Sequence, residues 1–159
     1  MVDPINPQVL AKELINSEST MAIGTAGEGT AWVAPVYYVF FQGAMYFFSS
    51  PDSRHIQESL KSGQAAATIY PSSSSWKVIR GLQMSGRIQK VHAGPKALGA
   101  VLAYAAKYPF IRDFFDTEED VDLERIASRF RARLYRFDPD LVFYLDNKIR
   151  FGFREAIQL

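Results

Sequence analysis

Residues 45–55, MYFFSSPDSRH, carry the side chains best suited to chemistry in this sequence. A strand is expected to end at the two serines, turn at the proline and lead into a helix near Ser53. The first turn of a helix offers free backbone N–H groups and the positive end of the helix dipole, which attract anions. The hydroxyls of Ser49, Ser50 and Ser53, with the guanidinium of Arg54, would complete a cradle for a phosphate group. A simple helix cap beside a solvated arginine would explain the same residues.

A second candidate is residues 32–36, WVAPV, within a long apolar segment that we expect to form a strand. A proline removes one hydrogen-bond donor, so Pro35 belongs at a sheet edge or where the backbone meets another molecule. The backbone amides of Val33, Ala34 and Val36 could bind the polar edge of a planar heterocycle. A strand with one bulge would show the same pattern.

Residues 77–91 form the third candidate, because apolar and polar positions alternate there as in a strand with one buried face. The even-numbered positions supply the apolar face, and the polar face includes Gln83 with the small Gly81 beside it. This polar face suits a ligand, a second subunit or solvent. Arg80 falls on the apolar face, so we expect either a bulge that rotates it or an anion that pairs with it.

Several kinds of site are not expected. There are no cysteines and only two histidines, which excludes disulfides, thiol catalysis and Cys-ligated zinc and argues against any metal centre. The 18 Lys and Arg nearly balance the 17 Asp and Glu, so no general positive field is available for nucleic acid. No apolar run approaches the roughly 18 residues of a membrane span. The N-terminus has no signal-peptide pattern, and a cytoplasmic protein without a membrane partner is expected.

The length of 159 residues suits one domain, and no repeat or linker divides it. Turns at 27–29 and 42–43 join the first strands directly, which favours antiparallel pairing. Together with a helical insertion at about 94–130, this pattern predicts a mainly β, α+β domain, an antiparallel barrel with peripheral helices. Strands are expected at 20–25, 31–41, 45–49, 65–70, 77–91, 132–137 and 141–145, with a turn at 138–140, and alternation at 149–153. Helices are expected at 7–17, 53–63, 95–108 and 120–130.

Three segments, in this order, resemble the pyridoxamine 5′-phosphate oxidase-like FMN-binding split-barrel superfamily. They are TAGEGTAWVAPVYY at 25–38, MYFFSSPDSRH at 45–55 and IRGLQMSGRIQKV at 79–91. The tail LDNKIRFGF is similar to that of a small bacterial branch. The resemblance implies that residues 1–159 form a single FMN-binding domain, a six-stranded antiparallel split barrel. It also implies a homodimer with FMN at the interface.

The resemblance further implies where FMN would lie: its phosphate on the serines and Arg54, its ring against the backbone of Val33–Val36, with Trp76 to Gln83 contributed by the second subunit. The implied cofactor-binding residues are Val33, Ala34, Pro35, Val36, Ser49, Ser50, Ser53, Arg54, His55, Trp76, Arg80 and Gln83. His55 stands where many members have a lysine, and Gly81 where the oxidase has a glutamine. The tail lacks the Arg-x-Trp-x-Leu pattern of the true oxidase, so pyridoxamine oxidation is not expected.

Three functions are consistent with these features. The first is an FMN-dependent oxidoreductase that transfers hydride or electrons between a reduced donor and a small-molecule acceptor. The flavin itself carries that chemistry, so no catalytic side chain is assigned, and Tyr37, Trp76 and Phe151 are expected to shape the pocket. The second is haem binding or degradation, known in related split barrels, with His55, His92 or a tyrosine as ligand. The third is a non-catalytic flavin carrier or sensor, or a dimer that has lost its cofactor.

Overall fold

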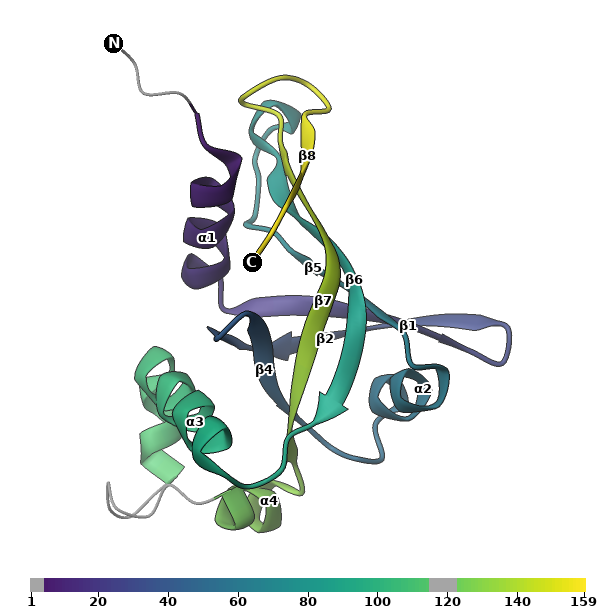
Figure 1. Ribbon diagram of the computed structural model, residues 1–159, viewed down its shortest axis with the longest axis vertical. Helices are drawn as coiled ribbons and strands as arrows, with labels where there is room; N and C mark the ends of the chain where they lie inside the picture. The colour runs from purple at the N-terminus through teal and green to yellow at the C-terminus, as the bar shows by residue number, and fades with distance from the viewer. Residues whose placement is uncertain (1–4, 115–122) are drawn as a thin grey trace.

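One eight-stranded antiparallel sheet forms the body of the computed structural model, which describes residues 5–114 and 123–159 (Figure 1). The strand order is β2-β1-β5-β6-β7-β4-β3, and β8 pairs with β7. The strands are β1 (Thr20–Gly27), β2 (Thr30–Tyr37), β3 (Val39–Phe41), β4 (Ala44–Ser49), β5 (Ala65–Ile69), β6 (Arg80–Lys90), β7 (Arg133–Asp146) and β8 (Arg154–Ile157). The helices are α1 (Pro7–Ser17), α2 (Arg54–Ser62), α3 (Pro95–Lys107) and α4 (Leu123–Phe130), with short 3-10 helices η1 (Trp76–Val78) and η2 (Pro109–Phe114).

The sheet closes into a barrel because its two edges are consecutive pieces of chain. β2 pairs with β1 at one edge and β3 pairs with β4 at the other, and only Tyr38 separates β2 from β3. A single residue spans no more than about 7 Å, so the two edges must meet. The predicted antiparallel barrel is confirmed, with eight strands rather than six. The predicted strand 31–41 is in fact two strands, broken where the barrel closes.

Tyr38 holds this closure in place. Its hydroxyl donates to the Ile15 carbonyl at 2.6 Å, and its backbone N–H donates to the Ser19 carbonyl at 3.2 Å. Its own carbonyl accepts the hydroxyl of Tyr108, which follows α3. The ring is fully buried, and burial raises the pKa of its phenol well above the usual range. The barrel seam is therefore tied to α1 on one side and to the helical insertion on the other.

The predicted turn at 138–140 is wrong, because strand β7 runs unbroken through these residues for a length of 14 residues. The pairing of β6 with β7 shifts register between Ser85 and Gly86, opposite Pro139. A Cβ on Gly86 would lie 2.1 Å from the Asp138 carbonyl oxygen, so only glycine fits there. The bulge accommodates the proline within a long strand, and the Asp-Pro-Asp sequence therefore bends the strand without ending it.

The strand β7 is also where the barrel is split. Its first part pairs with β4 and its last part with β8 along the same edge, while β6 follows the other edge. The main core fills the barrel and includes Ile23, Phe47, Leu82, Phe137 and Tyr144. A second apolar cluster, which includes Tyr46, Val101 and Tyr104, attaches α3 to the outside.

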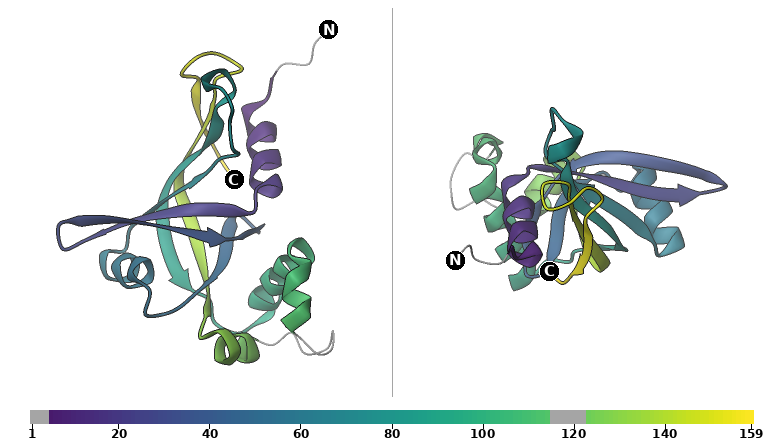
Figure 2. Two further views of the ribbon diagram at one scale, coloured as in Figure 1. Left: turned by 180° about the vertical axis from the view of Figure 1, so that it is seen from behind. Right: turned by 90° about the horizontal axis from the view of Figure 1, so that it is seen from above.

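The helices lie around the barrel rather than within it (Figure 2). α1 and α3 lie on one side, and α2 lies beside the β1–β2 hairpin, which projects from the other side. Between β6 and β7 lie α3, η2 and α4, so the predicted insertion is helical where described; residues 115–122, the start of the predicted helix 120–130 among them, lie outside the described part. None of the described helices is long and apolar enough to cross a membrane.

Two further element predictions need correction. The strand expected from residue 77 begins at Arg80, because the residues before it form η1. The alternating residues 149–153 are a turn, with Gly152 at a φ of 72°, and the strand β8 follows them. In both places the apolar residues lie on a turn or a short helix next to a strand and not in the strand itself.

Candidate functional site

Three side chains of the predicted cradle meet where β4 ends and α2 begins. The Ser49 Oγ lies 2.9 Å from the His55 Nε2 and 3.1 Å from the Ser53 Oγ. The Ser53 hydroxyl also donates to the Ser50 carbonyl at 2.7 Å. His55 is buried, with 8% of its surface exposed, and the serines are half-buried. Two hydroxyls and one imidazole nitrogen thus share a single small site.

The N-terminus of α2, which is the positive end of the helix dipole, lies at this site and is not capped by a side chain. Ser53 is the N-cap residue, but its side chain makes no capping hydrogen bond. The Ser53 carbonyl accepts hydrogen bonds from the N–H groups of Ile56 and Gln57. The N–H groups of Arg54 and His55 therefore come before the first hydrogen bonds of the helix. No acidic residue occupies the first turn. Uncapped N–H groups without a nearby carboxylate on the helix are what an anion requires.

His55 contributes no fixed charge to the cradle. Burial lowers the pKa of its imidazole below the usual 6.5, so the neutral form prevails at neutral pH. In many relatives a lysine is expected at this place, as the sequence motif indicated. A side chain within the cradle therefore carries a positive charge only when His55 takes up a proton.

The Arg54 side chain lies apart from the serines, against the β1–β2 hairpin. Its Nε is 2.7 Å from Glu58 Oε1, and its Nη2 donates to the Thr30 hydroxyl at 2.5 Å. The guanidinium also lies over the Trp32 ring, 4.8 Å from its centre. The Thr25 hydroxyl donates to Glu58 at 2.6 Å, and this bond and the Arg54 bond lower the pKa of Glu58. Arg54 thus gives the cradle its backbone N–H, while its charge is shared with Glu58.

Residues Val33–Val36 lie in β2, which pairs with β1 and is an edge of the sheet. Pro35 stands opposite Ala22 in β1, so the prediction that the proline belongs at an edge agrees with its position. Val33 is 63% exposed. Next to it, an open groove of about 900 Å³ has walls from the β1–β2 hairpin and a floor of small residues from β1, β5 and β6. The groove is lined by Gly24, Thr25, Ala26, Ala31, Trp32, Val33, Ser62, Gly63, Gln64, Ala65, Ala66, Ser85, Gly86, Arg87 and Asp140.

Strand β6 has the two faces that its alternation predicts. Gln83 and the other odd-numbered residues from 83 to 89 are exposed, while the even-numbered ones between them are buried. Arg80 is half-buried and stands directly opposite Asp146 in the pairing with β7. The Tyr144 hydroxyl donates to Asp146 Oδ2 at 2.8 Å; burial raises the pKa of Tyr144, and the nearby Arg80 lowers it in part. Arg80 thus lies beside the Tyr144 hydroxyl, which donates to the buried carboxylate of Asp146.

Gly81 leaves no room for the glutamine of the oxidase. A Cβ there would lie 2.9 Å from the Ile69 carbonyl oxygen and 3.2 Å from the Tyr70 Cβ. Tyr70 and Gln83 line a cavity of about 320 Å³ on the outer face, together with Thr68, Pro71, Ser72, Ser73, Ile79, Arg80, Gly81 and Leu145. Tyr70 was not predicted as a site residue; its only signal in the sequence is an aromatic residue at the end of a strand, before a proline.

Two of the three expected pocket aromatics come together at one end of the barrel. Trp76 and Phe151 are exposed and meet edge to face, with ring centres 5.4 Å apart. Asn147 joins their segments, because its Nδ2 donates to the Trp76 carbonyl at 2.6 Å and its Oδ1 accepts from the Gly152 N–H at 3.1 Å. Tyr37 lies elsewhere and packs on Tyr108 at the seam.

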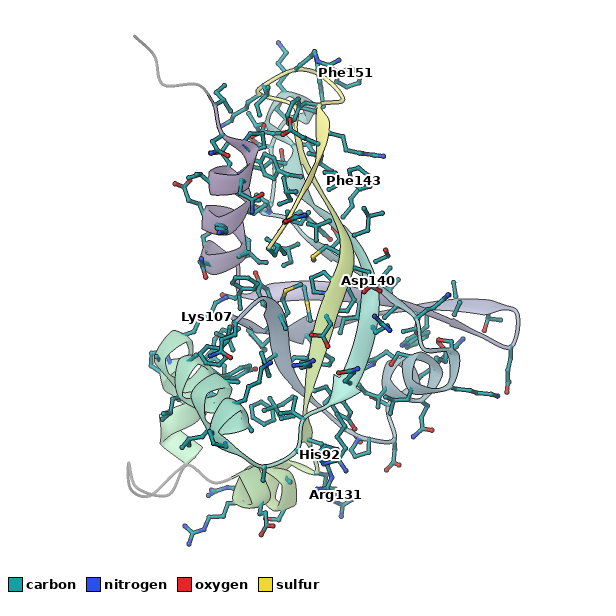
Figure 3. The ribbon with its side chains drawn as sticks, in the orientation of Figure 1. His92, Lys107, Arg131, Asp140, Phe143 and Phe151 are labelled. Atoms are coloured by element: carbon teal, nitrogen blue, oxygen red, sulfur yellow. The ribbon has the colours of Figure 1, made fainter. Side chains whose placement is uncertain are left out.

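Phe151 lies at the top of the molecule in Figure 3, whereas α2 lies at the side of the barrel beside the β1–β2 hairpin (Figure 1). The cradle and the Trp76 region do not meet within one chain. His92 is exposed in the connection from β6 to α3. Among residues 5–114 and 123–159, no group of three or more His, Cys, Asp or Glu is placed to hold a metal ion.

The closed antiparallel sheet, split along β7 and carrying peripheral helices, defines a split-barrel protein. Residues 10–142 match the family described as pyridoxamine 5′-phosphate oxidase, and the chain belongs to that family. This result confirms the resemblance that the sequence motifs indicated.

Individual relatives are more distant. The UPF0306 protein YhbP of Escherichia coli O157:H7 is 26% identical over 127 residues, which cover 79% of this chain and 75% of YhbP. Among solved structures, a heme-binding protein from Mycobacterium smegmatis has a TM-score of 0.73 at 14% identity, and the superposition covers 99% of this chain and 60% of the M. smegmatis chain. An FAD-binding protein from Mesorhizobium loti has a TM-score of 0.59 at 15% identity, and the superposition covers 84% of this chain and 90% of the M. loti chain. Likeness at this identity shows a shared fold.

Proposed function

We propose that this protein is a homodimeric FMN-binding flavoprotein that transfers hydride or electrons between a reduced donor and a small-molecule acceptor. The observation that carries the proposal is the cluster of Ser49, Ser53 and His55 at the open start of α2, in a member of the pyridoxamine 5′-phosphate oxidase family. Bound FMN would supply the redox chemistry itself, and the protein would supply position and electrostatics.

The chemistry of the donor set fits a phosphate group. Phosphate oxygens accept hydrogen bonds, and the cradle offers two hydroxyls, an imidazole nitrogen and the N–H groups of the first helical turn. The Asp52 carboxylate, the nearest in sequence, is exposed and makes no hydrogen bond to Ser49 or Ser53 among the described residues, while the Asp52 backbone N–H donates to the Ser50 Oγ at 3.3 Å. We assign phosphate binding to Ser49, Ser50, Ser53, His55 and the backbone of Arg54.

The ring system would lie along β2. The exposed strand edge at Val33, Ala34, Pro35 and Val36 faces away from β1, and the adjoining groove has room for a tricyclic ring. Backbone groups at such an edge can hydrogen-bond a heterocycle without any special side chain. This explains how a chain with few candidate acids and bases could still hold a flavin.

A second copy of the chain would complete the site. Trp76 packs against Phe151, which Figure 3 shows far from α2 of its own chain, and both aromatic side chains are exposed and suit an interface. Arg80 and Gln83 follow Trp76 along the chain and would reach the second site with it. In a two-fold dimer the same two regions would meet twice, giving two sites. The exposed apolar residues that this arrangement would cover are Val33, Tyr70, Trp76, Ile79 and Phe151.

The test is an absorbance spectrum of the purified protein, with and without added FMN, followed by gel filtration. We expect flavin bands that stay with the protein at dimer size. The Ser49→Ala, Ser53→Ala double variant should lose FMN while remaining folded. Ser128→Ala, an exposed serine of α4, is the matched control and should bind as the unaltered protein does. A protein that ignores FMN would contradict the proposal.

Haem binding is the second candidate, because a structure of similar fold is that of a heme-binding protein. The two histidines differ as ligands. His55 is buried with its Nε2 beside Ser49, whereas His92 is exposed. A Soret band on addition of haem that disappears in His92→Ala would favour this candidate over flavin.

A further inference from the structure

His55 is the titratable side chain in hydrogen-bond contact with the cradle serines, and the sequence resemblance implies a lysine at this place in many members of the family. Given the proposed phosphate site, we propose that FMN binding by this protein is coupled to uptake of a proton by His55, so that the cradle binds phosphate tightly only when its imidazole is charged. A lysine in this place would be charged at every physiological pH. The histidine makes the affinity respond to pH.

The geometry places the imidazole among the phosphate donors. The Nε2 lies 2.9 Å from the Ser49 Oγ and 3.5 Å from the Ser53 Oγ, and these two oxygens are 3.1 Å apart. An anion that accepts both hydroxyl protons therefore lies next to Nε2 as well. The ring cannot easily move away, because His55 is buried in the first turn of a helix whose Ile56 is fully buried.

The environment of His55 favours the neutral ring until an anion arrives. Burial disfavours the charged form and lowers the pKa of the imidazole. A bound phosphate reverses this balance, since an opposite charge in direct contact favours the imidazolium and raises the pKa. A group whose pKa rises on binding takes up a proton, and binding is then stronger at lower pH.

The other charged groups around His55 cannot replace it as the titrating group. On its own helix and the preceding loop are Asp52, Arg54 and Glu58, of which Arg54 and Glu58 form an ion pair. β1, β2, β4 and β5 carry no charged residue. From β6, Arg87 is exposed and paired with Asp140 at 3.2 Å.

From β7, Arg133 stands opposite Ser49 in the pairing with β4 and stays charged. The neighbouring Tyr135 stacks on Phe47, and burial raises the pKa of its phenol, so it stays neutral. His92 follows β6 on the far side of β7 and makes no hydrogen bond to Ser49 or Ser53 among the described residues. His55 is therefore the described side chain in hydrogen-bond contact with the cradle hydroxyls whose charge changes between about pH 6 and about pH 8.

The experiment is a fluorescence titration of the full-length protein with FMN at about pH 6, 7 and 8 and constant ionic strength. We expect FMN to bind at least about tenfold more tightly at about pH 6 than at about pH 8, since one unit of pKa shift is a factor of ten. Riboflavin, which lacks the phosphate, should show no such dependence. Calorimetry in two buffers of different ionisation enthalpy should show proton uptake with FMN.

Two variants separate the titration of the imidazole from that of the phosphate. The second pKa of a phosphate is about 6, so the phosphate loses charge at low pH and its own titration weakens FMN binding there. His55→Lys should bind FMN tightly at every pH, and His55→Gln should bind weakly at every pH. An unaltered protein with equal FMN affinity at all three pH values and no proton uptake would overturn the proposal. So would a His55→Lys variant with the same pH profile as the unaltered protein. Absence of FMN binding at every pH would instead contradict the phosphate site itself.

Discussion

Arg54 and Glu58 form an ion pair one helical turn apart in α2, with 2.7 Å between Nε and Oε1, and this pair directs the guanidinium away from Ser49 and Ser53. The pair also ties α2 to the β1–β2 hairpin through Thr25 and Thr30. The arginine that the motif assigns to phosphate therefore has a partner already. Glu58 partly neutralises the positive charge of Arg54, which weakens the attraction of Arg54 for an anion in the cradle.

The first prediction concerns this competition. Arg54→Ala should weaken FMN binding several-fold, because it removes a positive charge close to the phosphate site while the backbone N–H remains. Glu58→Gln should strengthen FMN binding several-fold, because it removes the opposing carboxylate and frees the guanidinium. Flavin fluorescence titrations measure both affinities at one ionic strength.

The control for this pair is the double variant. Arg54→Ala combined with Glu58→Gln should bind FMN as weakly as Arg54→Ala alone, since the freed group is no longer there. If Glu58→Gln strengthens binding equally in both backgrounds, the effect comes from the lost carboxylate and not from Arg54. Unchanged affinity in Arg54→Ala would remove the arginine from the site.

The second prediction is a loss of stability in acid that depends on His55. Burial lowers the pKa of His55 in the folded protein below the 6.5 of the unfolded chain. The unfolded chain therefore binds more protons as the pH falls through and below 6.5, and the FMN-free protein loses stability there. Above that pH both states are neutral and the contribution is constant.

Urea unfolding of the FMN-free protein at about pH 7.5 and about pH 5.5 measures this effect against the usual acid loss from carboxylates. His55→Gln should show a smaller drop in midpoint between the two pH values. Equal drops in the two proteins would show that the buried histidine does not carry the change.

The third prediction concerns the close approach at Gly81. Gly81→Ala should destabilise the protein by about 1–3 kcal/mol, because the new Cβ would press on the Ile69 carbonyl at 2.9 Å. Gly94→Ala is the matched control: no atom lies within 4 Å of a Cβ there, and we expect little change. Urea midpoints of the two variants decide the matter. Similar stability in both would mean that β5 moves to admit the side chain.

The sequence predicted the architecture where local patterns and the fold agree. Helix α1 begins with its Asn6 cap and Pro7 as expected, and the alternation in β6 identified the buried and exposed faces. It failed where long-range pairing decides the local structure. Tyr38 breaks a continuous apolar run because the barrel closes there. Pro139 stays within β7 because this strand bulges at Asp140, and Gly86 of β6 leaves room opposite the proline.

The candidate site was likewise predictable where its residues are close in sequence and not where they come from distant segments. The short spacing between Ser49 and His55 allowed the cradle to be predicted, because a strand end, a turn and a helix start bring these residues together locally. The Arg54 partner was not predictable in the same way. Glu58 is near in sequence, but Thr25, Thr30 and Trp32 reach the arginine only through the hairpin. The opposition of Arg80 and Asp146 likewise depends on strands far apart in sequence.

The fourth prediction concerns Lys107, at the end of α3. Its ammonium donates to the Glu18 carbonyl and lies 4.3 Å from the centre of the Tyr38 ring. Burial lowers the pKa of Lys107 to about 8, partly opposed by Glu18, whereas the unfolded chain keeps the ordinary value of 10.5. Between these values the unfolded chain binds more protons, so the folded protein gains stability as the pH rises from about 8 to about 10.

Lys107→Arg tests this directly, because arginine stays charged over that range. Its urea midpoint should gain less than that of the unaltered protein between about pH 8 and about pH 10. If both proteins respond alike, the tyrosines around the seam, and not Lys107, govern stability in alkali.

The fifth prediction tests whether two chains share one site. Each chain would offer the cradle of Ser49 and Ser53 to one site and the Trp76–Gln83 region to the other. The Ser49→Ala, Ser53→Ala variant and a Trp76→Ala, Gln83→Ala variant should therefore each bind FMN poorly alone. In a heterodimer of the two, one site combines both defects while the other combines the intact cradle with the intact Trp76 region. Differently tagged chains, co-expressed and purified through both tags, should bind one FMN per dimer with the affinity of the unaltered protein. A heterodimer that binds no FMN tightly would place the whole site within a single chain, and Trp76 would then act through the stability of its own loop.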